Sequence, residues 1–320
     1  MKKGFVFILV TAILFSTSEI ILKIDTGAFN AIQFVFLRFG IGSIVLLPFA
    51  IKSLKKQSYH LSLRDFLFLA FTGFICVVVS MIFYQMAIVY LQAAVVAVLF
   101  CCNPVFVVIF AFLLLHNKIY RHTIISLIIS IAGIIVIMNP FHMTGNPIGF
   151  VFLILSTITF AFYSVIGRKR SSKFGGLALT CFSFLFGSIE LLILILITNI
   201  PVVARFFSLT NLKLFSSIPI IQGINLHSLP ALLFAGILVT GIGYTTYFLS
   251  IEATSNITAS IAFFIKPALA PILAFIFINE SLTLTMIVGI SLIIIGALAS
   301  FIPDFRMQNQ RIQSQKIKRP

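Results

Sequence analysis

Residues 4–9 read Gly-Phe-Val-Phe-Ile-Leu, and residues 149–154 read Gly-Phe-Val-Phe-Leu-Ile. The same separation of 145 positions matches Phe15 to Phe160. A neighbouring match, Gly40 to Gly187, gives a separation of 147. These matches predict that the chain is built from two related halves.

Further along, the two halves keep a constant separation of 163 positions. The identical pairs are Gly73 and Gly236, Tyr84 and Tyr247, Pro104 and Pro267, and Gly133 and Gly296. Four matches at one separation are hard to obtain from apolar composition alone. The increase of 16 positions over 147 predicts an insertion in the second half, which we assign to the long polar stretch at 199–228.

The composition indicates a membrane protein. Of the 320 residues, 60% are hydrophobic and 9% are charged, whereas soluble domains are about 45–50% apolar and about 25% charged. A helix of about 20 apolar residues spans a bilayer. The apolar runs predict about ten such helices, at 4–24, 29–51, 65–87, 93–115, 122–140, 148–167, 175–198, 229–250, 256–278 and 284–302.

Basic residues define the predicted orientation, because loops rich in Lys and Arg stay in the cytoplasm. With the N-terminus inside, seventeen of the 22 basic residues fall on the inner side, at 2–3, 52–64, 118–121, 168–173 and 306–319. The outer side receives Arg205 and Lys213. The sequence therefore predicts a multi-pass protein of the cell (cytoplasmic) membrane with both termini cytoplasmic. The net charge of +15 is then explained by orientation and contact with anionic lipid, and nucleic acid is not expected as a partner.

An odd number of helices in each half means that the second half enters the membrane from the opposite side. The predicted fold is therefore all-α, with two inverted-topology five-helix repeats at 1–145 and 146–303 and a basic cytoplasmic tail at 304–320. Inverted repeats are typical of secondary transporters, in which the halves rock around a site near the bilayer midplane.

The sequence around the fourth helix of each half resembles a known family. The first half has Leu-Phe-Cys-Cys-Asn-Pro-Val-Phe at 99–106, and the second has Ala-Phe-Phe-Ile-Lys-Pro-Ala-Leu-Ala-Pro at 262–271. With ten spans in a five-plus-five repeat, the chain resembles an EamA-type member of the drug/metabolite transporter superfamily over residues 4–302. The resemblance implies a transporter without cofactor.

In that family, the helix after this proline commonly ends in Glu, followed by a polar turn and a helix that contains Gly. The second half has this pattern, with Glu280 followed by Gly289 and Gly296, whereas the first half has His116 and Asn117 at the corresponding place. We expect Glu280 to stabilise the N-terminus of the tenth helix, because a carboxylate is favourable there.

Four charged residues fall inside predicted spans: Glu19, Arg38, Glu190 and Lys266. A charge at the bilayer centre costs at least about 2.5–3.5 kcal/mol, so such residues normally face a cavity or a partner. Counting from the span ends places Lys266 near the midplane and the other three nearer the outer third. Ion pairs between them are therefore expected.

Lys266 precedes Pro267, and Pro271 follows one turn later. Proline removes a backbone donor and opens a helix locally. With Pro104 at the matched position, we expect paired interrupted helices around a transport site. One hypothesis is that Lys266 contacts an anionic group of the substrate or is released from Glu19 during transport. The alternative is a permanent structural pair with Glu19 or Glu190.

Glu19 is the candidate for proton coupling, because burial favours the neutral carboxyl group. The alternative is a fixed pair with Lys266 or with Lys23, one turn along the same helix. Arg38 resembles an arginine that is often found in the family's second helix, and snorkelling to lipid headgroups is the simpler interpretation. Tyr84 and Tyr247 are candidates to line the cavity, with aromatic packing as the alternative.

These features predict a secondary transporter for a small metabolite, such as an amino acid or another carboxylate-bearing compound, with proton coupling as a hypothesis. The alternatives are a channel or a lipid-translocating subunit, and then an integral-membrane enzyme. The sequence shows neither a nucleotide-binding loop nor metal-ligand spacing, so we expect no catalytic residues, no metal and no cofactor. The expected partners are a small-molecule substrate and membrane lipid, and a homodimer is left open.

Overall fold

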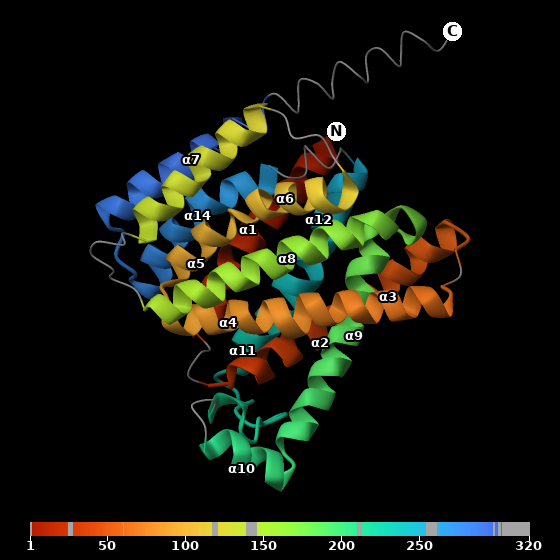
Figure 1. Ribbon diagram of the computed structural model, residues 1–320. Helices are drawn as coiled ribbons and strands as arrows, with labels where there is room; N and C mark the ends of the chain where they lie inside the picture. Colours follow the sequence, from red (N-terminus) through yellow and green to blue (C-terminus); the bar gives the residue numbers. More distant parts are fainter. Residues whose placement is uncertain are drawn as a thin grey trace.

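The computed structural model describes residues 2–24, 28–59, 61–116, 121–138, 146–209, 213–253, 261–296, 298–299 and 302, and all regular elements within them are helical (Figure 1). The elements are α1 (Lys2–Ile24), α2 (Ala31–Lys56), α3 (Leu63–Gly73), η2 (Phe74–Ser80), α4 (Met81–Tyr90), α5 (Ala93–Phe100), α6 (Asn103–Leu115), α7 (Arg121–Met138), α8 (Pro147–Phe174), α9 (Gly176–Thr198), α10 (Pro201–Leu209), η3 (Lys213–Phe215), α11 (Leu229–Leu233), η4 (Phe234–Gly243), α12 (Tyr244–Ala253) and α14 (Ile261–Ile278). A further helix covers Leu284–Gly296.

Seven helical segments among the described residues are long and apolar enough to cross a membrane. They are Lys3–Ile24, Ala31–Lys56, Leu63–Tyr90, Ala93–Leu114, Pro147–Gly167, Gly176–Thr198 and Leu229–Ser250. Shorter apolar helices at Ile124–Ile137, Ile265–Ile278 and Leu284–Gly296 lie within the other three predicted ranges. The outward faces carry large apolar side chains, such as Ile128 (62% exposed) and Phe277 (66% exposed), as expected for helices in lipid.

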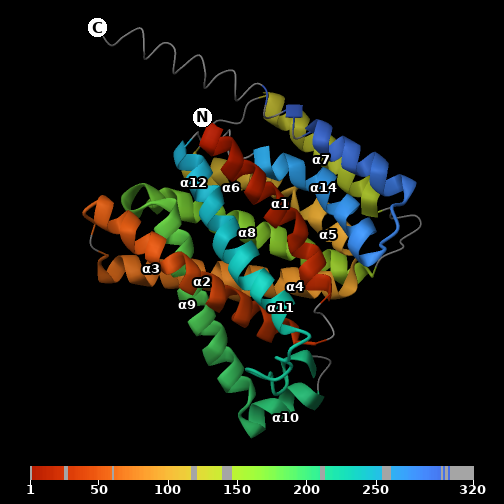
Figure 2. The same cartoon turned by 180° about the vertical axis from the view of Figure 1, so that it is seen from behind.

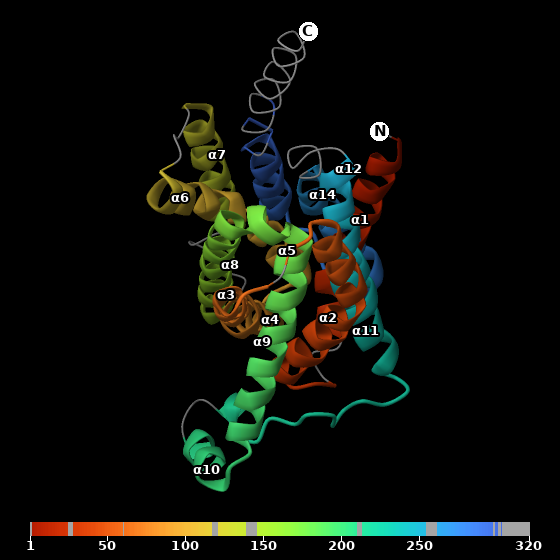
Figure 3. The ribbon, with the colours of Figure 1, turned by 90° about the vertical axis from the view of Figure 1, so that its right-hand side faces the viewer.

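The helices form two sides of one bundle. Seen from the side, α4, α6 and α8 lie on one side, and α1, α2 and α12 lie on the other (Figure 3). The helices α4 and α8 pack along each other, and α1 packs against α12 and α14 (Figure 2). Each side therefore combines helices from both halves of the sequence.

Glycines set the close contacts between these helices. A Cβ atom on Gly42 would lie 2.4 Å from Thr240 Cγ2, and one on Gly187 would lie 2.6 Å from Val77 Cβ. Thr240 and Val77 are themselves separated by 163 positions, so the two contacts are equivalent. Small residues allow such close helix packing in membranes.

These contacts correct the sequence match of Gly40 with Gly187. Nothing lies within 4 Å of a Cβ atom on Gly40, whereas Gly42 makes the contact equivalent to that of Gly187. The triplet Gly-Ser-Ile occurs at 42–44 and at 187–189, a separation of 145. The separation therefore stays at 145 through the second helix, and the value of 147 was wrong because one glycine was matched without its neighbours.

A second pair of equivalent contacts joins α7 to the helix at Leu284–Gly296. A Cβ atom on Gly133 would lie 2.9 Å from Gly289 O, and one on Gly296 would lie 3.0 Å from Ser126 O. In addition, Ser126 Oγ donates a hydrogen bond to Gly296 O at 2.6 Å. Gly133 and Gly296, and likewise Ser126 and Gly289, are 163 positions apart.

Two π-helical segments were not predicted. The segment η2 ends at Ser80 and η4 ends at Gly243, which are again 163 positions apart. The helix ends also match: His116 and Asn279 both adopt left-handed backbone conformations, with φ of 53° and 52°. π-Helical turns are rare and often found at functional sites, and Thr240 of η4 lines the cavity described below.

The described residues of the long stretch at 199–228 include segments that pack against the bundle. It contains α10 and η3, and α10 projects from the end of α9. Gln33 Nε2 donates to Ile220 O at 3.2 Å and to Gln222 O at 2.6 Å, and Asn30 Nδ2 donates to Leu214 O at 3.0 Å. The loop therefore covers the end of α2. The predicted basic tail at 304–320 lies outside the described residues.

Candidate substrate cavity

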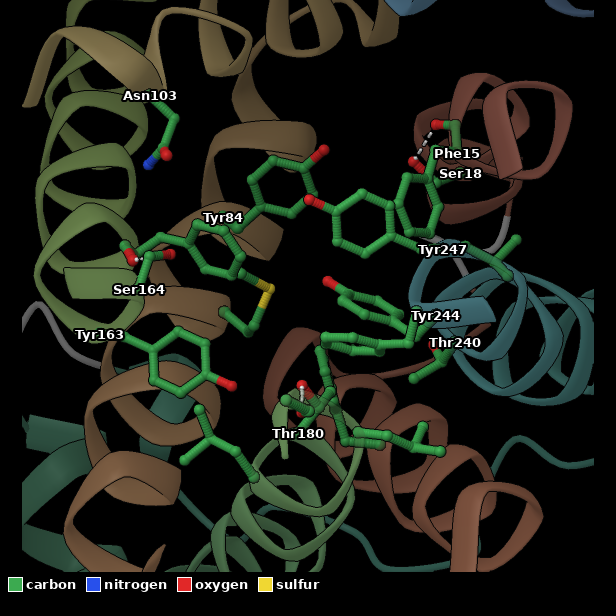
Figure 4. Close-up of a pocket in the computed structure, with 18 of the residues that line it drawn as sticks. Phe15, Ser18, Tyr84, Asn103, Tyr163, Ser164, Thr180, Thr240, Tyr244 and Tyr247 are labelled. Carbon is green, nitrogen blue, oxygen red and sulfur yellow. Dashed lines mark hydrogen bonds between the residues drawn. The ribbon is translucent and has the colours of Figure 1, made fainter. Parts of the chain in front are cut away.

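A cavity of about 670 Å³ lies between the two sides of the bundle. Its labelled lining in Figure 4 comes from α1 (Phe15, Ser18), α4 (Tyr84), α6 (Asn103), α8 (Tyr163, Ser164), α9 (Thr180), η4 (Thr240) and α12 (Tyr244, Tyr247). The volume is in the range of small-molecule sites. Both predicted tyrosines, Tyr84 and Tyr247, line it.

Nine of the residues that line the cavity are aromatic. On one wall, the Tyr84 ring lies 4.7 Å from the Phe100 ring, which lies 5.4 Å from Phe160. On the other wall, the Tyr244 ring lies 5.1 Å from that of Phe15. Phe15 and Phe160 are the matched pair of the repeat. Such walls suit the apolar body of an organic molecule and leave a few polar groups to orient it.

Glu19 lies behind this lining, 1% exposed, and its carboxylate accepts three hydrogen bonds. Lys266 Nζ lies 2.5 Å from Oε1, and the Tyr84 hydroxyl donates to the same oxygen. Ser18 Oγ donates to Oε2 at 2.7 Å. The acid is therefore held by α14, by its own helix α1 and, through Tyr84, by α4 on the opposite side of the bundle.

Lys266 is also buried, with 6% of its surface exposed, and its ammonium lies 5.9 Å from the centre of the Phe100 ring. The pair that it forms with Glu19 is one of those expected from the sequence. The alternative partner of Glu19, Lys23, instead donates to Ile88 O and Leu91 O, both at 2.7 Å. A cation is favourable beside these free carbonyl groups at the C-terminal end of α4.

Arg38 lines the cavity and is 5% exposed. Its guanidinium lies 4.5 Å from the centre of the Phe39 ring, and Nη2 donates weakly to Met81 Sδ at 3.7 Å. Among the described residues, Nε is buried without a hydrogen-bond partner. The expectation that Arg38 snorkels to the headgroups is therefore wrong, because its face of α2 turns toward the cavity and not toward lipid.

The cavity extends to the end of the bundle where α2 ends and α9 begins. Ser53, Gln57 and Gly175 line it there. Just beyond, Asp65 caps the start of α3 and accepts a hydrogen bond from the Tyr59 hydroxyl at 2.9 Å. That hydrogen bond raises the pKa of Tyr59. The loop between α2 and α3 is thus anchored beside the mouth of the cavity.

Similarity to known proteins identifies the family to which a chain with this cavity belongs. The profile of the EamA-like transporter family matches residues 2–139 and 147–302. The chain belongs to the EamA-like transporter family. It is 38% identical over 309 residues to an uncharacterized transporter of Clostridium kluyveri, covering 94% of each chain.

The chain is also similar to a more distant relative and, in its fold, to a solved structure. Solute carrier family 35 member F3 of Homo sapiens is 32% identical over 128 residues, which cover 39% of this chain and 29% of that protein. A solved crystal structure at 15% identity superimposes with a TM-score of 0.63, covering 96% of this chain and 99% of the other. The chain is thus a multi-pass membrane protein of a transporter family, which points away from an enzyme.

The acid of the EamA pattern, Glu280, does not start the tenth helix as expected. Its Oε1 and Oε2 accept hydrogen bonds from the backbone N–H groups of Ala93 and Ala94, at 2.7 and 3.0 Å. It therefore caps α5, a helix of the other half. The prediction was wrong because the free N–H groups that a carboxylate satisfies belong to a helix that is distant in the sequence.

The EamA prolines act differently in the two halves. In the first, the helix breaks at Cys101 and Cys102, and α6 begins with Pro104 in its first turn. In the second, α14 continues through Pro267 and Pro271. The expectation of two interrupted helices is therefore wrong for the described residues, because α14 is continuous through both of its prolines.

Glu190 lies apart from the cavity. It is half-buried on α9, beside the exposed Ile189 and Ile193, and its Oε2 is buried without a hydrogen-bond partner among the described residues. Lys266 pairs with Glu19 and not with Glu190.

The sequence analysis missed Asn103, whose Nδ2 donates to Thr157 O at 3.0 Å at the cavity edge. The separation of 163 positions would have found it, because Asn103 is the equivalent of Lys266. Ser164 likewise corresponds to Glu19 at a separation of 145. The positions equivalent to Lys266 and Glu19 thus carry the uncharged side chains of Asn103 and Ser164.

Proposed function

We propose that this protein is a secondary transporter that moves a small organic metabolite across the cytoplasmic membrane by alternating access. The observation that carries the proposal is the cavity of about 670 Å³ between the two sides of the bundle, with the Lys266–Glu19 pair against its wall. The recurrent contacts at separations of 145 and 163 positions support two inverted five-helix halves, which is the architecture that rocks around a central site.

The cavity reaches the end of the bundle that carries Lys52, Lys55, Lys56 and Lys173. By the positive-inside rule this end is cytoplasmic, so the conformation is inward-facing with a cytoplasmic N-terminus. At the other end, Ile32, Phe34 and Val35 are buried, and Gln33 holds the loop at 220–222 over α2. The loop and these side chains supply the outer closure.

The Glu19 cluster is the proposed coupling element. The Tyr84–Glu19 hydrogen bond spans from α4 to α1, across the two sides. Protonation of Glu19 removes the charge that holds Lys266 and weakens both contacts, because a neutral carboxyl group is a poorer acceptor than a carboxylate. Proton binding from one face would then favour separation of the two sides there. A ligand or proton shifts such an equilibrium by its differential affinity for the two states.

The test is transport by the purified full-length protein in proteoliposomes. We expect saturable uptake of a labelled compound from a pool of amino acids and organic acids, counterflow against the unlabelled compound, and a dependence on a pH gradient. Glu19→Gln removes the response to the gradient, whereas the matched variant Glu190→Gln, at an intramembrane acid away from the cavity, keeps it. Flux without saturation or counterflow would instead indicate a channel and contradict the proposal.

A further inference from the structure

The cavity holds a positive charge that no described residue neutralises. Arg38 and Lys266 are the charged side chains of its lining, and Lys266 is paired with Glu19. No carboxylate among the described residues lies within 4.0 Å of the Arg38 guanidinium. The carboxylate of Glu19 is already occupied by Lys266, Tyr84 and Ser18.

The contacts that Arg38 does make are weak. The Met81 sulfur is a poor acceptor, at 3.7 Å from Nη2, and Nε has no partner in the described part of the chain. A side chain that is 5% exposed therefore retains unused donors beside a cavity. An unpaired ion in such a position is costly unless a counter-charge or water meets it.

We propose that Arg38 is the anion-binding group of the cavity, and that the cavity takes a small organic carboxylate with an apolar, preferably aromatic, body. This inference rests on the proposed function and names its substrate class. The guanidinium presents parallel N–H donors that match the two oxygens of a carboxylate. The aromatic walls around Tyr84, Tyr244 and Tyr247 receive the body (Figure 4).

This assignment separates two roles that the sequence alone gave to one residue. Lys266 is engaged with Glu19 in the inward-facing conformation, so it is not free to hold an anion there. Arg38 supplies the recognition, and the Lys266–Glu19 pair remains available for coupling. Met81 connects the two places, because it contacts Arg38 and lies one turn before Tyr84, which binds Glu19.

The experiment compares acids with their neutral amides, which have the same body and no charge. The pairs are 3-phenylpropionate with 3-phenylpropanamide, indole-3-acetate with indole-3-acetamide, and hexanoate with hexanamide. Binding to the purified full-length protein is measured by calorimetry. We expect at least one acid to bind at least about tenfold more tightly than its amide, the value of one charge-assisted hydrogen bond, with a larger preference for the aromatic pairs.

In Arg38→Gln the preference for the acid disappears, while the amide still binds, which shows that the cavity is folded. Arg38→Lys keeps the charge without the planar fork and retains part of the preference. The matched control Glu190→Gln keeps the full preference, because this intramembrane acid is not part of the cavity lining. The inference is overturned if acid and amide bind the wild type equally, if no acid binds, or if the preference survives Arg38→Gln.

Transport is measured separately, so the two proposals fail in different ways. Saturable counterflow of compounds without an acid preference would leave the transporter intact and exclude the Arg38 subsite. Arg38-dependent binding of an acid that is never transported would support the subsite and contradict the proposed function.

Discussion

Lys266 Nζ lies 2.5 Å from Glu19 Oε1, although the two residues are 247 positions apart in the chain. The contact joins α14 of the second half to α1 of the first half beside the cavity. A buried pair of this kind adds little net stability, but its disruption leaves an uncompensated charge. In the proposed function, this is the contact that would hold one conformation and release it when one partner is neutralised.

Removal of one partner of this pair is expected to destabilise the protein more than removal of both. Glu19→Gln and Lys266→Gln should each lower the free energy of unfolding by up to about 3–5 kcal/mol. The double variant should lose less than the sum, because no charge is left unpaired. Thermal unfolding in detergent, followed for all four proteins, measures the coupling. Additive losses would show that the pair has no energetic role.

Removal of the Tyr84 hydroxyl is expected to lower stability and the pH-gradient response of transport more than removal of another hydroxyl of the cavity. Tyr84→Phe removes a donor to the buried Glu19 carboxylate, which should cost about 1–3 kcal/mol. The control is Tyr244→Phe, which removes a hydroxyl from the same cavity and leaves the three contacts of Glu19 in place. Thermal stability and the pH-gradient response of transport are compared. Equal effects of the two substitutions would argue against a special role for the Tyr84–Glu19 bond.

Glycine contacts provide a matched pair of packing tests. A Cβ atom on Gly73 would lie 2.5 Å from Ser183 O and 2.8 Å from Gly187 N, both backbone atoms that cannot move away alone. Gly73→Ala should therefore cost about 1–3 kcal/mol. Gly40→Ala, with nothing within 4 Å, should be neutral or stabilising by up to about 1 kcal/mol through helix propensity. Melting temperatures in detergent distinguish the two, and a stable Gly73→Ala protein would refute the packing argument.

Glu280 is expected to stabilise α5 and not the helix that follows it. Glu280→Ala leaves the N–H groups of Ala93 and Ala94 without their acceptor, at a cost of about 0.5–2 kcal/mol as for other helix caps. Glu280→Gln keeps one acceptor oxygen and should lose less. Hydrogen exchange resolves the location: protection should fall at 93–96, and a loss confined to 284–287 would restore the original expectation.

The orientation can be tested with single cysteines in a protein whose four native cysteines are replaced by serine. Gln57 is exposed at the mouth of the cavity, and Leu226 is 92% exposed in the long loop. A membrane-impermeant maleimide should label Leu226→Cys in intact cells and Gln57→Cys in inside-out vesicles. The reverse pattern would invert the proposed topology.

The positions of the helices and the pairing of equivalent residues could be predicted from the sequence, because they depend on apolar runs and on fixed separations. The apolar runs located the helices, and the separation of 163 positions paired Tyr84 with Tyr247 at the cavity. Counting depth along the spans placed Lys266 near the midplane and Glu19 nearer the outer third, but the cost of intramembrane charge correctly predicted an ion pair, which the structure shows between these two residues. These properties are carried by the order of residues along single helices.

Properties that depend on the face of a helix or on a distant partner could not be predicted. Arg38 has a depth that suits snorkelling, but the rotation of α2 turns it inward. Glu280 was assigned to the nearest helix, although its partners lie in α5.

The equivalence of Asn103 with Lys266 and of Ser164 with Glu19 has a thermodynamic consequence for a transporter of this architecture. If both halves were identical, exchange of their conformations would convert the inward-facing state into an outward-facing state of the same free energy. In this chain the ion pair joins Glu19 of the first half to Lys266 of the second half, whereas the equivalent positions 164 and 103 carry uncharged side chains. Under the proposed alternating access, the two states would therefore differ in which helices enclose a charge. The resting preference for one face of the membrane is then encoded by two side chains, and grafting Lys and Glu onto positions 103 and 164 should shift that preference toward balance.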